Sequence, residues 1–208
     1  AGGGRIKKKW PKVEKDLQKA GIQFDHVFTK APGHAIELAR NACNEYERII
    51  SAGGDGTSNE VLNGIMRNNP QETMFGILPL GTGNDIAAAF QIPEKVEEAI
   101  QVLCEGEIIK YDIGKAIDLT TQHIRYFAGV ASQGIDADVT ERTNKGRKWL
   151  PGTANYVSCV FKSLIRFQTQ TITLKLDERV YTNDFLLVAV GNGPRYGAGM
   201  KVCPHADV

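Results

Sequence analysis

Hydrophobic positions in the first half of the chain alternate between helical spacing and short apolar runs. Apolar residues at helical spacing predict four helices, near residues 10–17, 35–42, 61–66 and 96–103. Compact apolar runs between them predict three strands, at residues 24–29, 48–52 and 75–80. Strands that alternate with helices predict a mostly parallel sheet that is covered on both faces.

The second half of the chain has a different pattern. Its strand-like segments are short and separated by turns, at residues 111–118, 123–131, 171–177 and 184–192. A basic loop and one long helical stretch interrupt them, at residues 141–152 and 153–167. We therefore expect an α/β domain over residues 1–118 and a β-rich domain over residues 119–208.

The composition suits such a protein. With 208 residues, a net charge of +1 and 42% hydrophobic residues, the chain is typical of a globular protein with a buried core. The charge balance gives no sign of a nucleic-acid partner, and no apolar run approaches the roughly 20 residues that span a bilayer. The four cysteines are too far apart for a zinc motif and fit a reducing, cytoplasmic compartment.

The two ends of the chain favour a piece of a longer protein. The sequence begins with AGGGRIKKKW, without a methionine or a signal peptide, and ends with CPHADV just after a turn. We expect the first strand of the α/β domain to precede Ala1 and the last part of the second domain to follow Val208.

Two glycine-rich corners carry the candidate chemistry. The first reads IISAGGDGTSNEV and passes from a strand through three glycines into a helix expected to begin at Thr57. The first N–H groups of a helix are unpaired and partly positive, and glycines let phosphate oxygens reach the backbone. The spacing fits neither the common P-loop nor the G-x-G-x-x-G fingerprint. Asp55, a carboxylate among expected phosphates, indicates a Mg²⁺ ion or handling of a proton, and so favours phosphoryl transfer.

The second corner reads ILPLGTGNDIAAAF and again runs from strand to loop to helix. Thr82 and Asn84 offer hydrogen bonds to phosphate or ribose, and Asp85 can cap its helix or reach a metal. Because the two corners lie about one βαβ unit apart, we expect them to face one cleft at the carboxyl ends of neighbouring strands.

Together, GGDGTSNEVLNG and PLGTGND resemble the bacterial diacylglycerol kinase catalytic domain family, whose members include soluble lipid kinases related to sphingosine and ceramide kinases. AGGGR is similar to the tail of the family's N-terminal nucleotide loop, and YDIG to its domain-junction aspartate. GIDADV, ANYV and VAVGNGPRYGAGMKVCP are similar to parts of its second domain. The resemblance covers nearly the whole chain. The pair of corners is specific, whereas NAD kinases and phosphofructokinases carry corners similar to GGDGT.

The resemblance implies a Rossmann-like nucleotide domain followed by a β-sandwich-like lipid domain. It implies an ATP- and Mg²⁺-dependent kinase that phosphorylates the hydroxyl of diacylglycerol, giving phosphatidic acid, or of a related lipid alcohol. It further implies a network of aspartate, water and Mg²⁺ with Asp55, Asp85 and Asp112. The family's general base lies in a C-terminal Asp-Gly-Glu region without a counterpart in these residues, so we name no base and expect it beyond the chain end. The implied nucleotide contacts are Gly2, Gly3, Thr29, Gly53, Gly54, Asp55, Gly56, Thr57, Glu60, Gly81, Thr82 and Asn84.

Several of these residues have a purely structural alternative. Thr57 and Glu60 spell a capping box, T-S-N-E, that would serve only to start a helix. The structural alternative is a turn for Asp55 and Asp112 and a helix cap for Asp85. Thr29 rests on the resemblance alone.

Peripheral contact with an anionic membrane surface is a further expectation. The segment RTNKGRKW places four cations beside an aromatic ring that could touch lipid headgroups: Arg142, Lys145, Arg147, Lys148 and Trp149. The apolar spacing that follows also fits a core helix, and the lysines at positions 7, 8, 9 and 12 favour a solvated helix face. An NAD kinase-like enzyme, a non-catalytic nucleotide- or lipid-binding module, and the oligomeric state, including a homo-oligomer, stay open.

Overall fold

The structure, a computed structural model, describes residues 4–68, 73–135, 169–197 and 199–206. The chain forms two compact units: Ala1–Gly129 with Asn192–Val208, and Val130–Gly191. The residues from Asn192 onward thus belong with the first unit. The domain boundary expected between residues 118 and 119 stays a prediction.

A parallel pair of strands lies at the centre of the first unit. β1 (Arg48–Gly53) pairs with β2 (Met74–Pro79), so that Gly53 stands opposite Pro79 at their carboxyl ends. The predicted strands at residues 48–52 and 75–80 are therefore confirmed. Parallel strands need a crossover connection, which a helix supplies here.

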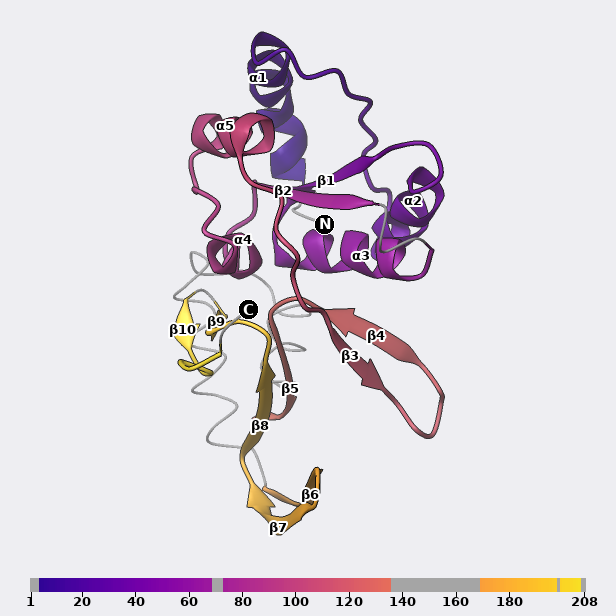
Figure 1. Ribbon diagram of the computed structural model, residues 1–208, viewed down its shortest axis with the longest axis vertical. Helices are drawn as coiled ribbons and strands as arrows, with labels where there is room; N and C mark the ends of the chain where they lie inside the picture. Colours follow the sequence, from indigo (N-terminus) through magenta and orange to yellow (C-terminus); the bar gives the residue numbers. More distant parts are fainter. Residues whose placement is uncertain (1–3, 69–72, 136–168, 198, 207–208) are drawn as a thin grey trace. The chain divides into compact units, whose positions relative to one another are not determined.

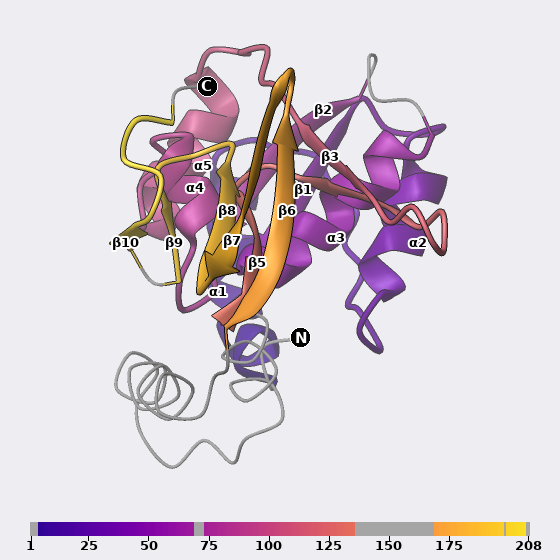
Figure 2. The ribbon, with the colours of Figure 1, turned by 90° about the horizontal axis from the view of Figure 1, so that it is seen from below.

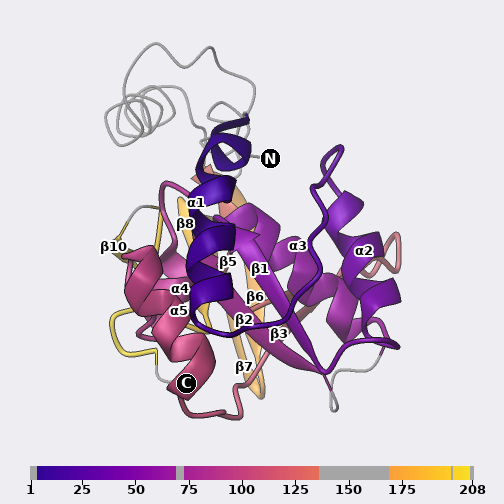
Figure 3. The same cartoon turned by 90° about the horizontal axis from the view of Figure 1, so that it is seen from above.

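Helices cover both faces of this pair, as the alternating pattern predicts. α3 (Asp55–Met66) lies on one face, and α1 (Arg5–Lys19) and α5 (Val96–Glu105) lie on the other (Figures 1 and 3). α2 (His34–Ala42) packs closely against α3, because a Cβ on Gly64 would collide with the α2 backbone. Within the described ranges, every helix is too short or too polar to cross a lipid bilayer.

Neighbouring residues of β2 point into two different cores. Leu78 packs in one core with Trp10 of α1 and Ile100 of α5. Ile77 packs in the other with Leu62 of α3. Because successive residues of a strand point to opposite faces, one short strand holds both helical layers.

The segment at residues 24–29, predicted as a strand, is not a strand in the structure. Its side chains do alternate: the rings of Phe24 and Phe28 lie 6.2 and 5.9 Å from the ring of Trp10, while Val27 is 65% exposed. A strand also needs a hydrogen-bonded partner, and no described strand pairs with this segment. The predicted strand is therefore wrong, although Phe24 and Phe28 are half-buried and pack against the core that holds Trp10.

A β-ribbon is anchored to α3 by a buried asparagine. β3 (Gly114–Ile117) and β4 (Ile124–Phe127) pair antiparallel, and both lie within segments predicted as strands. The side chain of Asn63, 2% exposed, donates to the carbonyl of Tyr126 at 2.8 Å and accepts from its N–H at 2.9 Å. The side chain thereby satisfies backbone groups on the outer edge of β4.

A second, shorter ribbon lies beside α4 (Asp85–Ala89) (Figures 1 and 2). It consists of β9 (Arg195–Tyr196) and β10 (Met200–Lys201), which pair antiparallel. A hydrogen bond of 3.3 Å from Cys203 N–H to the carbonyl of Pro194 closes its base.

The second unit consists of antiparallel pairs. β5 (Val130–Gly134) pairs with β8 (Leu187–Gly191), and β6 (Gln170–Leu176) pairs with β7 (Arg179–Phe185). The sequence pattern missed most of β7, because the segment RVYTNDF is mostly polar. Polar side-chain pairs between β6 and β7 stabilise this strand: Thr171 donates to Asp184 at 2.6 Å, and the hydroxyls of Thr173 and Thr182 lie 3.0 Å apart.

The helix expected at residues 153–167 and the basic loop at 141–152 lie outside the described residues. The proposed membrane contacts in that loop therefore stay predictions: Arg142, Lys145, Arg147, Lys148 and Trp149.

Tyr111 ties together two segments that are far apart in the sequence. Its hydroxyl lies 2.8 Å from the carbonyl oxygen of Ala128 and 2.7 Å from that of Asn192. Asn192 also donates its backbone N–H to the carbonyl of Gly129 at 2.7 Å, and its side-chain amide to the carbonyl of Asp112. Burial raises the pKa of Tyr111 to about 12.

We expect Tyr111→Phe to lower the free energy of unfolding by about 1–3 kcal/mol, because the single phenol O–H that the carbonyls of Ala128 and Asn192 share is lost. The folded pKa lies above the unfolded value near 10, so the phenol's contribution is complete below about pH 10 and is lost as the pH rises towards 12. The difference in stability between wild type and variant should therefore narrow in that range. Urea unfolding of wild type and Tyr111→Phe at neutral and alkaline pH measures this difference in the free energy of unfolding. Tyr181→Phe, at an exposed phenol of β7, is the control, and a difference between wild type and Tyr111→Phe that stays constant throughout contradicts the assignment.

Candidate functional site

The two glycine-rich corners adjoin at the carboxyl ends of β1 and β2. The N–H groups of Leu80 and Gly81 both donate to the carbonyl of Gly53, at 2.9 and 3.1 Å. A Cβ on Gly54 would lie 3.1 Å from the Cα of Gly81, and a Cβ on Gly81 would collide with Gly54. Gly81 therefore requires glycine, and Gly54 is tightly packed, because the two loops touch backbone to backbone.

Helix α3 begins at Asp55, two residues earlier than the sequence predicts, with Gly54 as its N-cap and no side-chain cap. The side chain of Thr57 covers Gly53: a Cβ on that glycine would lie 2.7 Å from the Thr57 Cβ. The interpretation of Thr57 as the first residue of a capping box is therefore wrong, because Thr57 lies inside the first turn.

Asp55 links the first corner to the second. Its Oδ1 accepts the N–H of Ile86 at 3.0 Å, in the first turn of α4. The carboxylate therefore stabilises the start of a helix that begins thirty residues later in the chain. An Asx turn, the structural alternative for Asp55, would use a neighbouring N–H instead.

The carboxylates of Asp55 and Asp85 converge on Gly83. A Cβ on this glycine would lie 2.9 Å from Asp55 Oδ2 and 3.7 Å from Asp85 Oδ2. Asp85 is the first residue of α4 and not its cap, because the N-cap is Asn84, in a left-handed conformation with φ 55°. Asp85 Oδ1 instead accepts the N–H of Gly199 at 2.8 Å, which ties the corner to the turn between β9 and β10.

The remaining predicted site residues, in the second corner and elsewhere, differ in their surroundings. Asn84 braces its own loop, because its Oδ1 accepts the N–H of Gly81 at 3.0 Å. Thr82 is exposed on the same loop. Thr29 is half-buried in the segment before α2. Gly2 and Gly3 lie outside the described residues.

Asp112 is exposed, and no group of three or more Asp, Glu, His or Cys side chains within the described ranges is placed to hold a metal ion. The structure thus brings together two of the three aspartates, Asp55 and Asp85. The three-aspartate network implied by the resemblance stays a prediction.

Glu60 caps a helix other than its own. Its two carboxylate oxygens accept the N–H groups of Gly33, at 2.9 Å, and Ala35, at 3.3 Å. These groups belong to the start of α2, whose N-cap, Gly33, lies at φ 83° and has no side chain of its own to cap the helix. The capping-box interpretation of Glu60 is therefore wrong, and a nucleotide contact of Glu60 stays a prediction.

We expect Glu60→Gln to lower the free energy of unfolding by about 1–2 kcal/mol, because the amide can accept only one of the two N–H groups and the charge at the helix N-terminus is lost. Chemical unfolding measures the change. Glu94→Gln, at an exposed carboxylate, is the matched control. Equal stability of Glu60→Gln and wild type would show that the two hydrogen bonds contribute nothing.

Two buried serines that no sequence pattern indicated hold the first corner in place. Ser51 of β1 and Ser58 of α3 are 1% and 2% exposed, and their hydroxyls lie 3.0 Å apart. The bond joins the end of the strand to the first turn of the helix across the glycine loop. Two serines seven residues apart give no periodic signal that would have indicated it.

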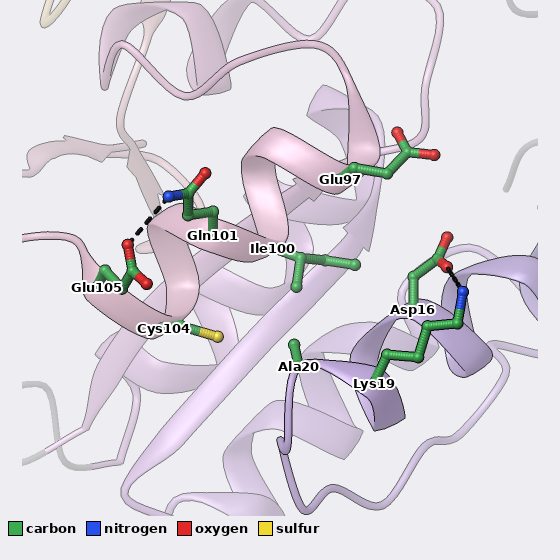
Figure 4. A pocket seen from close by; sticks show the side chains of 8 residues that line it. All are labelled: Asp16, Lys19, Ala20, Glu97, Ile100, Gln101, Cys104 and Glu105. Atoms are coloured by element: carbon green, nitrogen blue, oxygen red, sulfur yellow. Dashed lines mark hydrogen bonds and ion pairs between the residues drawn. The ribbon is translucent and has the colours of Figure 1, made fainter.

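An open pocket of about 370 Å³ lies between α1 and α5 (Figure 4). None of the corner residues lines it. Three carboxylates and one ammonium group do, with the 3.8 Å ion pair of Lys19 and Asp16 and a 3.0 Å hydrogen bond from Gln101 to Glu105. An acidic lining repels phosphate, so this pocket is not a candidate for the nucleotide.

Comparisons with known proteins agree with the two corners. Residues 1–116 match the family model "Diacylglycerol kinase catalytic domain", and residues 129–208 match "YegS C-terminal NAD kinase beta sandwich-like domain". The fold class, α/β with a parallel pair and a β-sandwich-like second part, is thereby confirmed.

Two curated relatives carry the name diacylglycerol kinase. The protein from Staphylococcus saprophyticus is 33% identical over 98% of this chain and 65% of its own length. The protein from Staphylococcus carnosus is 32% identical over 97% of this chain and 64% of its own length. The chain therefore spans slightly less than two thirds of the length of these relatives.

Solved structures show the same fold. A crystal structure of a diacylglycerol kinase from Bacillus anthracis str. Sterne matches with a TM-score of 0.69 and 24% identity, over 96% of this chain and 63% of that one. Another structure from the same organism matches with a TM-score of 0.76 and 25% identity, over 99% of this chain and 68% of that one. Since the first family model covers more than half of the chain and the relatives align along nearly all of it, the chain belongs to the diacylglycerol kinase catalytic domain family.

Proposed function

We propose that the protein containing this chain is an ATP- and Mg²⁺-dependent lipid kinase that transfers the γ-phosphate to the hydroxyl of diacylglycerol or a related lipid alcohol. The observation that carries the proposal is the convergence of the Asp55 and Asp85 carboxylates on Gly83, where the two corners touch. Carboxylates held beside the start of a helix suit a cation that accompanies phosphate.

Gly56 supports the approach of phosphate to this corner. Packing explains the two glycines before it, since Thr57 covers Gly53 and the second loop touches Gly54. A Cβ on Gly56, in contrast, would meet no atom within 4 Å, and the residue is exposed in the first turn of α3. The fold itself does not require glycine there. Open space beside unpaired helix N–H groups is where phosphate oxygens can bind.

The residues present fit Mg²⁺. Oxygen ligands are those that Mg²⁺ prefers, and it is commonly bound by one or two carboxylates together with substrate phosphates and water. Asp55 and Asp85 provide two such carboxylates, each fixed by a backbone hydrogen bond through its other oxygen. When bound, the cation would neutralise charge that develops on the phosphate oxygens.

The chain's own groups have distinct roles in this proposal. The first N–H groups of α3 bind phosphate oxygens, and the Ser51–Ser58 bond and the contact of Gly54 with Gly81 fix the loop that presents them. Thr82, exposed on the second loop, is available to the nucleotide. We assign no general base within the described residues, and the role of Asp112 rests on the resemblance alone.

The names of the relatives support diacylglycerol as the acceptor. Peripheral contact with a membrane surface follows from an acceptor that resides in a bilayer, and a cytoplasmic location fits the free cysteines of the described residues, Cys43, Cys104 and Cys203.

A transfer assay tests the proposed function. The full-length protein is given radiolabelled ATP with Mg²⁺ and a panel of acceptors: diacylglycerol, monoacylglycerol, undecaprenol, a sphingoid base and NAD. Labelled phosphatidic acid supports the proposal. Labelled NADP would instead support an NAD kinase-like enzyme, and nucleotide binding without transfer to any acceptor would support a non-catalytic module.

A further inference from the structure

Arg195 and Lys201 stand directly opposite each other on the β9–β10 ribbon. Directly opposite residues of an antiparallel pair share one face, with Cβ atoms about 4.5–5.5 Å apart. Both side chains are exposed, and none of the ion pairs found in the described part of the chain involves either of them. The ribbon therefore presents two neighbouring positive charges to solvent.

Such a pair is unfavourable in the free protein, because like charges at directly opposite positions destabilise a ribbon. An anion bound between the two cations offsets their repulsion, because it attracts both of them. Arginine and lysine both form charge-assisted hydrogen bonds with phosphate, the guanidinium group often through two N–H groups at once. A phosphate group is therefore the ligand that the pair fits.

The ribbon is fixed beside the candidate site. The turn between its strands is held by the hydrogen bond from Gly199 N–H to Asp85 Oδ1, 2.8 Å long. Because Lys201 follows Gly199 by two residues, their Cα atoms lie within about 7 Å of each other. Arg195 stands opposite Lys201, so both cations lie near the corner that carries Asp85.

We propose that Arg195 and Lys201 form a phosphate-binding pair at the rim of the candidate site. Its ligand is a phosphate group, supplied by the nucleotide or by an anionic lipid headgroup. The source of the phosphate rests on the proposed function. Binding of inorganic phosphate groups by the pair does not, because it needs no transfer reaction.

The first test compares pyrophosphate binding to the full-length protein and to its double variant Arg195→Gln/Lys201→Gln, by calorimetry and by thermal unfolding. We expect the dissociation constant for pyrophosphate to rise about tenfold in the variant, the loss expected for two exposed charge contacts. Without pyrophosphate, the variant should be at least as thermally stable as wild type, because the repulsion is gone. A packing role for the two residues would instead lower its stability.

The matched control is Lys115→Gln/Arg125→Gln on the β3–β4 ribbon. It removes one lysine and one arginine from an exposed ribbon of the same unit, but there Lys115 stands opposite Tyr126 and Arg125 opposite Ala116. We expect this variant to keep the wild-type affinity for pyrophosphate. Equal affinities in wild type and Arg195→Gln/Lys201→Gln, or an equal loss in the control, would overturn the proposal.

The second test identifies the source of the phosphate with ADP and with vesicles of phosphatidylglycerol or of neutral phosphatidylcholine. Weaker binding of ADP in Arg195→Gln/Lys201→Gln assigns the pair to the nucleotide, and weaker binding to phosphatidylglycerol vesicles alone assigns it to the lipid headgroup. If the variant loses neither, the pair has no role at the rim. If wild type fails to bind ADP, the proposed function fails, while the pyrophosphate comparison still decides whether the pair binds phosphate.

Discussion

Asp55→Asn is expected to lower the rate of phosphoryl transfer by about a thousandfold, because it removes a charge at the point where the two corners meet. The fold should survive. Asparagine can still accept the N–H of Ile86 through its own Oδ1, so the free energy of unfolding should change by no more than about 1 kcal/mol. Turnover and urea unfolding measured on the same preparation check both parts of the expectation.

Asp118→Asn is the matched control for this variant. Asp118 also accepts backbone N–H groups, from Thr120 at 2.8 Å and Thr121 at 3.0 Å, but in the exposed turn of the β3–β4 ribbon. We expect Asp118→Asn to retain full activity. Mg²⁺ should raise the melting temperature of wild type more than that of Asp55→Asn. Transfer within a few-fold of wild type would exclude a catalytic role for Asp55, and a large loss of stability would assign it to the helix cap alone.

Gly81→Ala is expected to reduce transfer by about a hundredfold or more, because the added Cβ collides with the backbone of Gly54 and forces the two loops apart. The same Cβ would lie 2.7 Å from Oδ1 of Asn84, which braces the loop. The backbone shifts that accommodate such overpacking should lower the free energy of unfolding by about 1–3 kcal/mol. Steady-state kinetics and chemical unfolding measure the two effects together.

Gly56→Ala separates packing from ligand access. Its Cβ meets no protein atom within 4 Å, so the variant should be as stable as wild type. If phosphate binds beside this residue, nucleotide affinity should nevertheless fall. Wild-type affinity in Gly56→Ala would place the phosphates elsewhere, and wild-type activity in Gly81→Ala would show that the loop contact is not needed.

Periodicity predicted the elements that bury one face. Trp10, Val13 and Leu17 gave the first helix from their spacing alone, and each is at most 8% exposed. The apolar runs that end in the two corners gave both parallel strands. The failures have one physical cause: a pattern of side chains does not show which backbone pairs with which. Residues 24–29 have the side-chain pattern of a strand, but no described strand pairs with them. β7 pairs with β6, although its sequence lacks the apolar pattern of a strand.

The contacts that assemble the candidate site were beyond sequence reasoning for a related reason. Glu60 accepts the N–H of Ala35, at the start of α2 and 25 residues away in the sequence. Asp55 accepts the N–H of Ile86, 31 residues away. A single long-range hydrogen bond leaves no repeat in the sequence. Glu60 does cap a helix, but the local spacing indicated its own helix, α3, and the structure shows that it caps α2. The glycines were explained by ligand access, whereas packing accounts for Gly53, Gly54 and Gly81.

The bond from Ile86 N–H to Asp55 gives the protein a spectroscopic reporter of its own. The resonance of an amide proton depends on the charge of its acceptor, and here that acceptor is one of the two carboxylates turned towards Gly83. The side chain of Ile86 is buried, 7% exposed, so a ligand at the corner need not touch it. A cation that neutralises Asp55 would therefore shift the Ile86 amide signal from within the neighbouring helix. Titration with Mg²⁺ alone, followed by NMR at this one amide, could register occupancy before any acceptor lipid is known.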